Sequence, residues 1–277
     1  MKFKTIVFWA SLALVVILTC TFVMAGKAIT LKGSDTLLML GQRWAELYMQ
    51  KNPGVVLQVT GGGSGVGIAA LINGSTDICQ ASRSMKDSEK KKLRDRYFSS
   101  GYEIAVAKDG VTLYINENNP VNELTLDQIS GIYTGKTTNW SQVGGPDAKI
   151  IVYGRENSSG TYVFFREKAM NNADYTSSMQ SLPGTAAVVN AVAKDKFGIG
   201  YGGAAYAKGV KELAIKTAKG SFKPNTETVK SGQYPLARNL YWYLQGKPSG
   251  EIKKIVDWVL SPEGQEVVQK VGYFTVK

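Results

Sequence analysis

The chain has 277 residues, a formal net charge of +11, two cysteines and no histidine. Without histidine there is no Ser-His-Asp triad, no Cys-His dyad and no histidine-ligated metal site, and two cysteines are too few for a cysteine-rich zinc or iron–sulfur site. We therefore expect no metal and no cofactor. The positive net charge is typical of proteins that bind nucleic acid, an anionic membrane or a small anion, so these three classes of partner are considered.

The first 25 residues have the pattern of a secretory signal peptide. Two lysines precede an uncharged, largely apolar run that ends in small residues before Gly26. We expect cleavage near Ala25-Gly26 and a periplasmic or secreted protein. Removing these 25 residues leaves 252 and lowers the formal charge from +11 to +9, because the segment holds two lysines and no acid. A retained membrane helix, or a lipid on Cys20, remains open as an alternative.

After this segment, short apolar runs alternate with stretches of helical periodicity, which is typical of an α/β fold. The expected strands are 28–32, 55–60, 78–81, 104–107, 111–115, 150–153, a strand near Tyr201, and 240–244. The expected helices are 36–51, 65–72, 86–97, 126–134, 161–170, 186–194, 251–260 and 262–271. The length favours two lobes over a single sheet. Cys79 lies in one of the apolar strands, so we expect a buried, unreactive thiol.

Three turns rich in glycine and hydroxyl residues lead from an expected strand into an expected helix. They are Gly33-Ser34-Asp35-Thr36, Gly61-Gly62-Gly63-Ser64-Gly65 and the segment 154–161. Each turn places hydroxyl groups and unpaired backbone N–H groups at a helix N-terminus, where anions are favoured. Arg155 adds a planar guanidinium in the third turn, and Ala81-Ser82-Arg83-Ser84 forms a fourth element of this kind.

Any one of these turns alone is an ordinary helix cap. The recurrence of all four at strand ends of one α/β chain predicts an anion site, because open sheets place their ligands there. A dinucleotide site is disfavoured, since Val66 stands where the third small residue of the fingerprint belongs. A phosphate-loop NTPase is excluded, because the sequence has no GxxxxGK[ST] motif.

Together the four elements resemble those of the phosphate-binding proteins of ABC-type phosphate importers, a family of type II-like periplasmic binding proteins. The most specific motif is Arg155-x-x-x-Ser159-Gly160-Thr161, and the resemblance extends over essentially the whole chain after residue 25, including the segments 199–201 and 234–238. It implies an α/β, two-lobed periplasmic-binding-protein fold with two crossover strands and the ligand in the inter-lobe cleft. We expect residues 26–107 and 238–277 in lobe 1 and residues 108–237 in lobe 2.

The resemblance also implies a function and a set of site residues. The function is high-affinity, extracytoplasmic binding of inorganic phosphate by a monomer, whose lobes close on the anion and which delivers it to ABC transporter permease subunits in the membrane, without catalysis. The implied ligand-binding residues are Ser34, Asp35, Thr36, Leu37, Ser64, Ser82, Arg83, Arg155, Ser159, Gly160 and Thr161.

Arg83 departs from the pattern of this family. Well-known members have an acid directly after the Ala-Ser pair, and that acid accepts the proton of hydrogen phosphate and repels sulfate. A buried carboxylate facing a dianion is costly unless a proton lies between them. We hypothesise that Asp35 takes over this discrimination and that Arg83 offsets its charge. The alternative is that Asp35 only caps its helix.

Other functions remain to be compared with phosphate binding. The same fold could take sulfate, molybdate, tungstate or an organic phosphate. A secreted phosphatase-like enzyme is disfavoured, since the acids are scattered and histidine is absent. The basic run 90–96 is interspersed with acids and is typical of a solvated helix face, so we expect no nucleic-acid partner. The aromatic residues Tyr241, Trp242 and Tyr243 are expected in the core.

Overall fold

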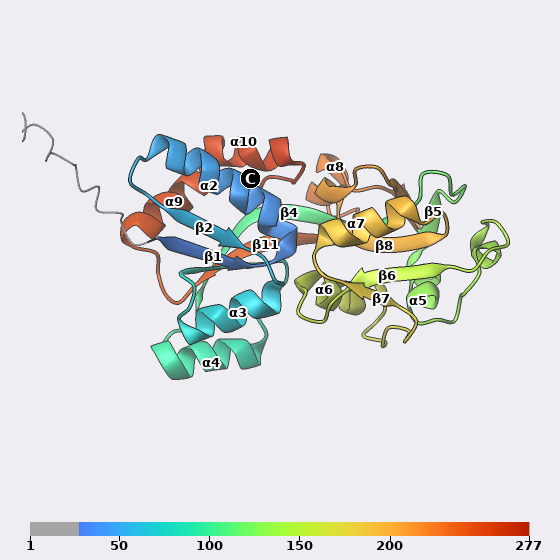
Figure 1. Ribbon diagram of the computed structural model, residues 1–277, viewed down its shortest axis with the longest axis horizontal. Coiled ribbons are helices and arrows are strands. Elements are labelled where there is room, and N and C mark those ends of the chain that lie inside the picture. The colour runs from blue at the N-terminus through green and yellow to red at the C-terminus, as the bar shows by residue number, and fades with distance from the viewer. Residues whose placement is uncertain (1–27, 277) are drawn as a thin grey trace, which may run out of the picture.

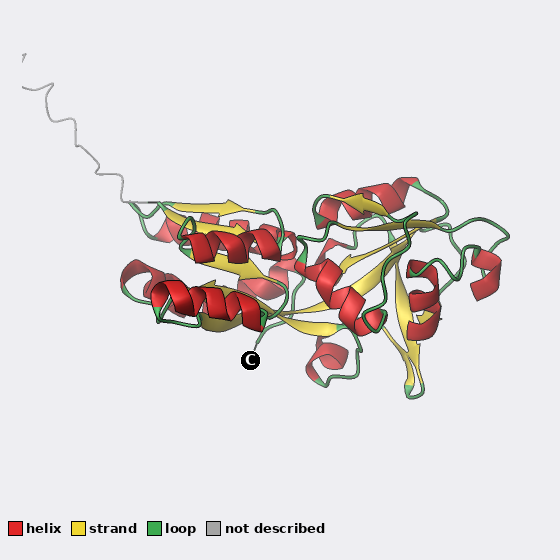
Figure 2. Cartoon of the chain, turned by 90° about the horizontal axis from the view of Figure 1, so that it is seen from below, coloured by secondary structure: helices red, strands yellow, loops and turns green. Residues whose placement is uncertain are grey.

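The structure is a computed structural model that describes residues 28–276. The expected signal peptide, with Cys20 and the Ala25-Gly26 cleavage position, lies outside the described residues. Within the described part of the chain, no helix is both long and apolar enough to cross a membrane. Two α/β lobes lie side by side (Figure 1). They are joined by β4 (Tyr102–Ile115) and β11 (Ala237–Leu244), and the view from below shows strands that pass from one lobe to the other (Figure 2).

The first lobe is a sheet with the strand order β2-β1-β3-β11-β4. Its parallel strands are β1 (Ile29–Gly33), β2 (Leu57–Thr60) and β3 (Ile78–Ala81). Helices α3 (Ser64–Asn73) and α4 (Asp87–Tyr97) cover one face, and α2 (Leu38–Lys51), α9 (Gly250–Leu260) and α10 (Pro262–Val271) cover the other (Figure 1). The edge-to-face pair of Trp44 and Trp242, with ring centroids 5.4 Å apart, packs between α2 and the sheet.

The second lobe continues the sheet through β8 (Gly198–Gly203), β6 (Ile151–Arg155) and β7 (Gln180–Leu182). A branch of β9 (Lys211–Thr217), β5 (Glu123–Thr125) and β10 (Gly220–Phe222) pairs with the end of β4. The helices are α5 (Leu126–Tyr133), α6 (Gly160–Ala169), α7 (Thr185–Lys194) and α8 (Thr226–Lys230). Phe165 and Tyr201 stack with centroids 4.0 Å apart in its core.

The strand β4 belongs to both lobes. Residues 102–110 pair with β11, and residues 111–115 pair with β8. The prediction of two separate strands, 104–107 and 111–115, was wrong, because the residues between them stay extended. Lys108 exchanges backbone hydrogen bonds with Phe274, and Asp109 pairs in register with Arg238. A continuous strand therefore links the lobes.

Most other predicted elements are confirmed, with shifts at their ends. The predicted helix 36–51 begins with a 3₁₀ turn, Asp35–Leu37, before α2. The structure adds β5, β7, β9, β10 and α8, which the sequence analysis did not predict. β5, β7 and β10 have only three residues and α8 has five, so periodicity could not reveal these four elements, whereas β9 has seven residues and was missed. The lobe bounds 26–107 with 238–277, and 108–237, stay a prediction.

The predicted environments of several side chains are confirmed. Cys79 is fully buried, and this burial raises the pKa of its thiol. Trp242 and Tyr243 are buried in the core, and Tyr241 is partly buried. Most of the basic residues on α4 are exposed to solvent, as a solvated helix face requires.

Candidate functional site

The turns that the sequence analysis selected meet where the two lobes face each other. The first lobe contributes the turn before α2, the N-terminus of α3 and the end of β3, and the second lobe contributes the N-terminus of α6 (Figure 1). The Gly65 N–H donates to the Ser158 carbonyl at 2.9 Å across this boundary. Segments about 90 residues apart in the chain are thus adjacent, as Gly65 and Ser158 illustrate.

Four predicted hydroxyl residues form two contacting pairs in this region. The Thr36 and Thr161 Oγ1 atoms, one from each lobe, are 3.0 Å apart. The Ser64 and Ser82 Oγ atoms are 3.2 Å apart, and the Ser82 N–H donates to Ser64 Oγ at 3.0 Å. All four side chains are buried. The structure therefore gathers hydroxyl groups that are spread over 126 residues of sequence, from position 36 to position 161.

Gly160 allows the lobes to approach so closely. A Cβ atom at this position would lie 2.3 Å from Ser64 Oγ and 2.7 Å from Ser82 Oγ, inside any real contact distance. Ser159 caps α6, since its Oγ accepts from the N–H groups of Thr161 at 3.1 Å and Tyr162 at 3.3 Å. The Ser159 oxygen is thereby used as an acceptor, and its hydroxyl proton is left to donate.

Asp35 and Arg155 form an ion pair between the lobes. Arg155 Nη2 donates to Asp35 Oδ2 at 2.5 Å, and Arg155 Nη1 donates to Thr185 Oγ1 at 2.9 Å. The other carboxylate oxygen of Asp35 accepts the Gly62 N–H at 2.8 Å. The Arg155 side chain is only 2% exposed, and its Nε has no hydrogen-bond partner among the described residues. This orphaned donor is available to an anion.

Arg83 has a different partner from the one we expected. It forms a two-pronged pair with Glu89 on α4, at 2.8 and 2.7 Å, and also donates to the Ser84 carbonyl. The expectation that Arg83 offsets the charge of Asp35 is therefore corrected: Arg155 does so. Burial opposes the ionisation of Glu89, but hydrogen bonds from Arg83 and the Lys86 N–H, together with the Arg83 charge, lower the pKa of Glu89.

Ser34 and Leu37 lie in the same turn, with their backbone groups already paired. The Ser34 N–H donates to the Gln80 carbonyl at 2.8 Å, and the Leu37 N–H donates to the Ser34 carbonyl at 3.0 Å. Both side chains are buried. The turn is held to β3 by the first of these bonds, which fixes the position of Thr36 beside the other hydroxyl groups.

Arg238, Asp109 and Thr185 also lie at the site, although they were not predicted from the sequence. Arg238 Nε and Nη2 donate to Asp109 Oδ2 at 3.0 and 2.7 Å, and both side chains are almost fully buried. Arg238 lies in a strand of otherwise mostly apolar and aromatic residues, and a cation in such a strand usually has a buried partner. The sequence therefore indicates that Arg238 has a buried acidic partner, but it does not indicate that the partner is Asp109.

Each arginine near the hydroxyl cluster is paired with its own carboxylate. The pairs are Arg83–Glu89, Arg155–Asp35 and Arg238–Asp109. The formal charges of the three pairs cancel. The positive character of the site therefore comes from oriented N–H and O–H groups and the N-terminus of α6.

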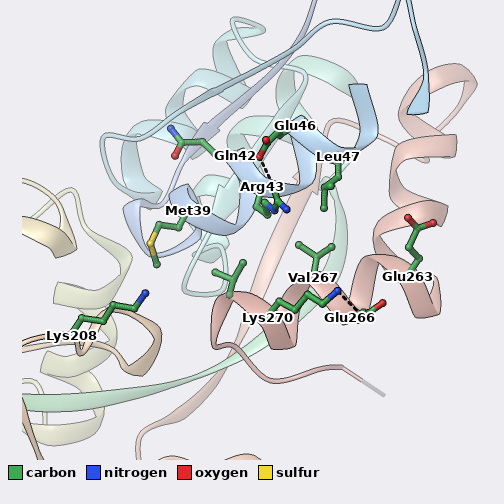
Figure 3. Close-up of a pocket in the computed structure, with 11 residues that line it drawn as sticks. Met39, Gln42, Arg43, Glu46, Leu47, Lys208, Glu263, Glu266, Val267 and Lys270 are labelled. Carbon is green, nitrogen blue, oxygen red and sulfur yellow. Dashed lines mark hydrogen bonds and ion pairs between the residues drawn. The ribbon is translucent and has the colours of Figure 1, made fainter. Parts of the chain in front are cut away.

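Two surface pockets differ in whether they lie beside the hydroxyl cluster. A pocket of about 510 Å³ between the lobes is lined by Ser82, Arg83, Phe164 and Arg238, among others. A larger groove, about 700 Å³, lies between α2 and α10, away from the hydroxyl cluster (Figure 3). Four of its charged side chains bind one another in the pairs Arg43–Glu46 and Lys270–Glu266, and Glu263 pairs with Lys51 outside the groove. The first pocket therefore lies next to the cluster, and a further one between the lobes, about 340 Å³, is lined by Asp35 and Thr185.

The fold and the site define a two-lobed binding protein, and comparison with known proteins supports this class. A family model described as PBP superfamily domain matches residues 24–263. The putative phosphate ABC transporter substrate-binding protein of Clostridium perfringens, solved with bound phosphate, superposes with a TM-score of 0.83 at 31% identity, covering 91% of this chain and all of that one. An ABC-type phosphate transport receptor from Vibrio cholerae gives a TM-score of 0.72 at 28% identity, covering 89% and 99%.

Curated relatives narrow the class further. The phosphate-binding protein PstS of Pseudomonas aeruginosa is 33% identical over 260 residues, covering 87% of this chain and 80% of that protein. PstS of Staphylococcus epidermidis is 34% identical over 253 residues, covering 87% and 77%. The chain belongs to the PBP superfamily and, within it, to the family of phosphate-binding proteins PstS. The predicted two-lobed α/β fold is confirmed.

Proposed function

We propose that this protein binds inorganic phosphate outside the cytoplasm and delivers it to the permease of an ABC transporter. The observation that carries the proposal is a buried cluster of hydroxyl groups, Thr36 with Thr161 across the lobes and Ser64 with Ser82 within the first lobe, together with the unpartnered Arg155 Nε. Hydroxyl and N–H donors that surround an anion on several sides suit a tetrahedral oxyanion. The names of the relatives support phosphate as that anion.

We assign the binding role to the predicted residues, which contribute hydrogen-bond donors from two lobes together with the acceptor carboxylate of Asp35. They are Ser34, Asp35, Thr36, Leu37, Ser64, Ser82, Arg83, Arg155, Ser159, Gly160 and Thr161. The lobes close on the anion and exclude water, which strengthens each hydrogen bond to it. The protein acts as a monomer that is exported with its first 25 residues removed, and it binds its ligand without turning it over. Closure presents the permease with a surface that the open form lacks.

Asp35 is the residue that we propose for discrimination between phosphate and sulfate. Its carboxylate is held by Arg155 and the Gly62 N–H, so each of its oxygens keeps a free lone pair. A protonated phosphate oxygen can donate to such a lone pair. Sulfate carries no proton at neutral pH, so it would meet the carboxylate as a like charge.

Isothermal titration against a panel of anions tests the proposed function. The protein is titrated with phosphate, sulfate, molybdate and tungstate under the same buffer conditions. We expect one-to-one binding of phosphate and no measurable heat from the other three. Stronger binding of another anion, or no binding of phosphate, would overturn the proposal. Incubation with a chromogenic phosphate ester should release no product, and turnover would identify an enzyme.

A further inference from the structure

Arg238 contacts hydroxyl groups of both lobes from a position on one of the connecting strands. Its Nη2 donates to Thr161 Oγ1 at 3.1 Å and to Thr36 Oγ1 at 3.4 Å, and its Nη1 donates to the Ser82 carbonyl at 3.0 Å. The guanidinium also lies 5.1 Å from the ring centre of Phe164 on α6. Every one of its nitrogen atoms therefore has a partner within the protein.

We propose that Arg238 is a positioning residue for the ligand: when the lobes close, it directs one hydroxyl proton of the Thr36–Thr161 pair toward the anion. The inference rests on the proposed function, since it needs an anion beside these threonines. Arg238 itself does not need to touch the anion, because its donors are already used.

The orientation follows from counting donors and acceptors. A hydroxyl oxygen has two lone pairs and one proton. Thr36 and Thr161 share one proton across their 3.0 Å contact. One N–H of Arg238 Nη2 donates to Asp109, and the other is shared between the two threonine oxygens. Whichever threonine receives the shared proton then accepts two hydrogen bonds, so both its lone pairs are filled. Its own proton can only donate outward, to a third acceptor such as an anion oxygen.

The position of Arg238 ties this orientation to lobe closure. Asp109, its carboxylate partner, lies on β4 and faces Arg238 in the register of β4 and β11, the two connecting strands. Asp109 is fully buried, and a Cβ atom on Gly203 would lie 2.8 Å from its Oδ1. The ion pair is thus fixed at the junction, while Thr36 and Thr161 come from opposite lobes. Arg238 bonds to both threonines only when the lobes meet.

A double-mutant cycle on the full chain tests the proposal, with inorganic phosphate as the probe. The single variants are Arg238→Lys and Thr161→Val. Arg238→Lys keeps the positive charge opposite Asp109 but loses the planar guanidinium with its several N–H donors, and Thr161→Val removes one hydroxyl. The control is Arg166→Lys, the same exchange on a partly exposed arginine of α6 that pairs with Asp174. Titration calorimetry gives each affinity, and thermal unfolding without phosphate checks that each variant is folded.

We expect Arg238→Lys to weaken phosphate binding about tenfold, and Arg166→Lys to leave it unchanged. In the Thr161→Val background, the same Arg238→Lys exchange should cost about threefold or less, because the nearer of its two target hydroxyls, and with it the threonine pair, is gone. A residue that acted only through general stability would give the full loss in both backgrounds. If Arg238→Lys does not fold, the double exchange Asp109→Asn with Arg238→Gln is used in its place. The double exchange leaves no unpaired buried charge.

The outcomes separate this inference from the proposed function. If the wild type does not bind phosphate, the proposed function falls. If the wild type binds phosphate, but Arg238→Lys matches Arg166→Lys, or its loss adds fully to that of Thr161→Val, Arg238 does not position these hydroxyls and the inference is overturned.

Discussion

At the scale of single residues, Asp35 illustrates how one side chain serves two purposes. Its backbone begins the 3₁₀ turn before α2, directly after the cap residue Ser34, and its carboxylate reaches across to Arg155 in the other lobe. A cap alone would have no need of a partner 120 residues away. The geometry therefore favours a role in the site over the simple cap that the sequence left open.

The exchange Asp35→Asn tests this role. Asparagine keeps the shape and one oxygen acceptor, but it removes the negative charge that would repel sulfate. We expect sulfate binding to become measurable by calorimetry and phosphate to bind more weakly. Asp127→Asn, which changes an exposed acid in the first turn of α5, is the control and should bind as the wild type does. Unchanged phosphate affinity with sulfate still excluded would limit Asp35 to a structural role.

At the scale of elements, the N-termini of α3, α4 and α6 are used in different ways. The first residues of α3 and α6 contact each other across the lobes through Ser64 and Gly160. The N-terminus of α4 instead holds Arg83 through Glu89, within one lobe. Two of the three helix starts therefore form the site, and the third anchors a charged residue beside it.

Gly160→Ala tests the contact between α6 and the first lobe. The added methyl group would meet Ser64 Oγ and Ser82 Oγ below 3 Å, so the lobes could not close fully. We expect phosphate affinity to fall by more than about tenfold in calorimetry. Thermal stability without phosphate should change little, because alanine suits a helix start that has no positive φ. Gly246→Ala, at a glycine with open space around it, is the control. Undiminished phosphate affinity in Gly160→Ala would show that the approach at Gly160 does not matter.

The ion pair at the start of α4 makes stability depend on pH. The pKa of Glu89 is lower in the folded protein, so the pair stabilises the fold at neutral pH and loses this effect as the pH falls through that pKa. We expect Glu89→Gln to lower the free energy of unfolding by about 1 kcal/mol at neutral pH, and by less in acid, because Glu89 keeps some exposure to water. Denaturant titrations at several pH values measure this. A difference that stays constant with pH, or one that Asp87→Asn reproduces, would contradict the assignment.

At the scale of the whole molecule, overall charge and local charge differ. The formal charge is +11 over the full sequence, yet the three arginines around the hydroxyl cluster are each matched by a carboxylate. Surface charges act over about one Debye length, roughly 10 Å at 0.1 M salt, and are screened beyond it. Affinity for a buried anion should therefore depend on local dipoles and little on the net charge.

A salt titration tests whether the phosphate affinity is independent of the net charge. We expect the phosphate affinity of the wild type to change by less than about threefold between low and high sodium chloride, since buried pairs are screened weakly. Asp35→Asn leaves Arg155 without its carboxylate, so its affinity should fall more steeply with salt. Equal slopes in the two proteins would show that the pairing does not govern the electrostatics of the site.

The sequence predicted the turns better than it predicted their partners. Glycine, hydroxyl and capping patterns are local, so the positions of Thr36, Ser64, Ser82 and Thr161 at strand ends could be predicted, and the structure brings them together. Ion-pair choice depends on tertiary packing over more than 100 residues. Asp35 was therefore matched with nearby Arg83 instead of Arg155, and the Arg238–Asp109 pair was not predicted.

The inter-lobe bond of Asp35 and Arg155 has a consequence for kinetics. Because protein groups alone form it, it lowers the free energy of the closed form before any ligand arrives, which raises the closed fraction of the unliganded protein. An anion that binds the closed form more tightly than the open form then gains apparent affinity in proportion to that closed fraction. The same bond must break before release. Asp35 keeps 13% of its side chain exposed, so water can compete for the carboxylate and let a carrier give up its cargo.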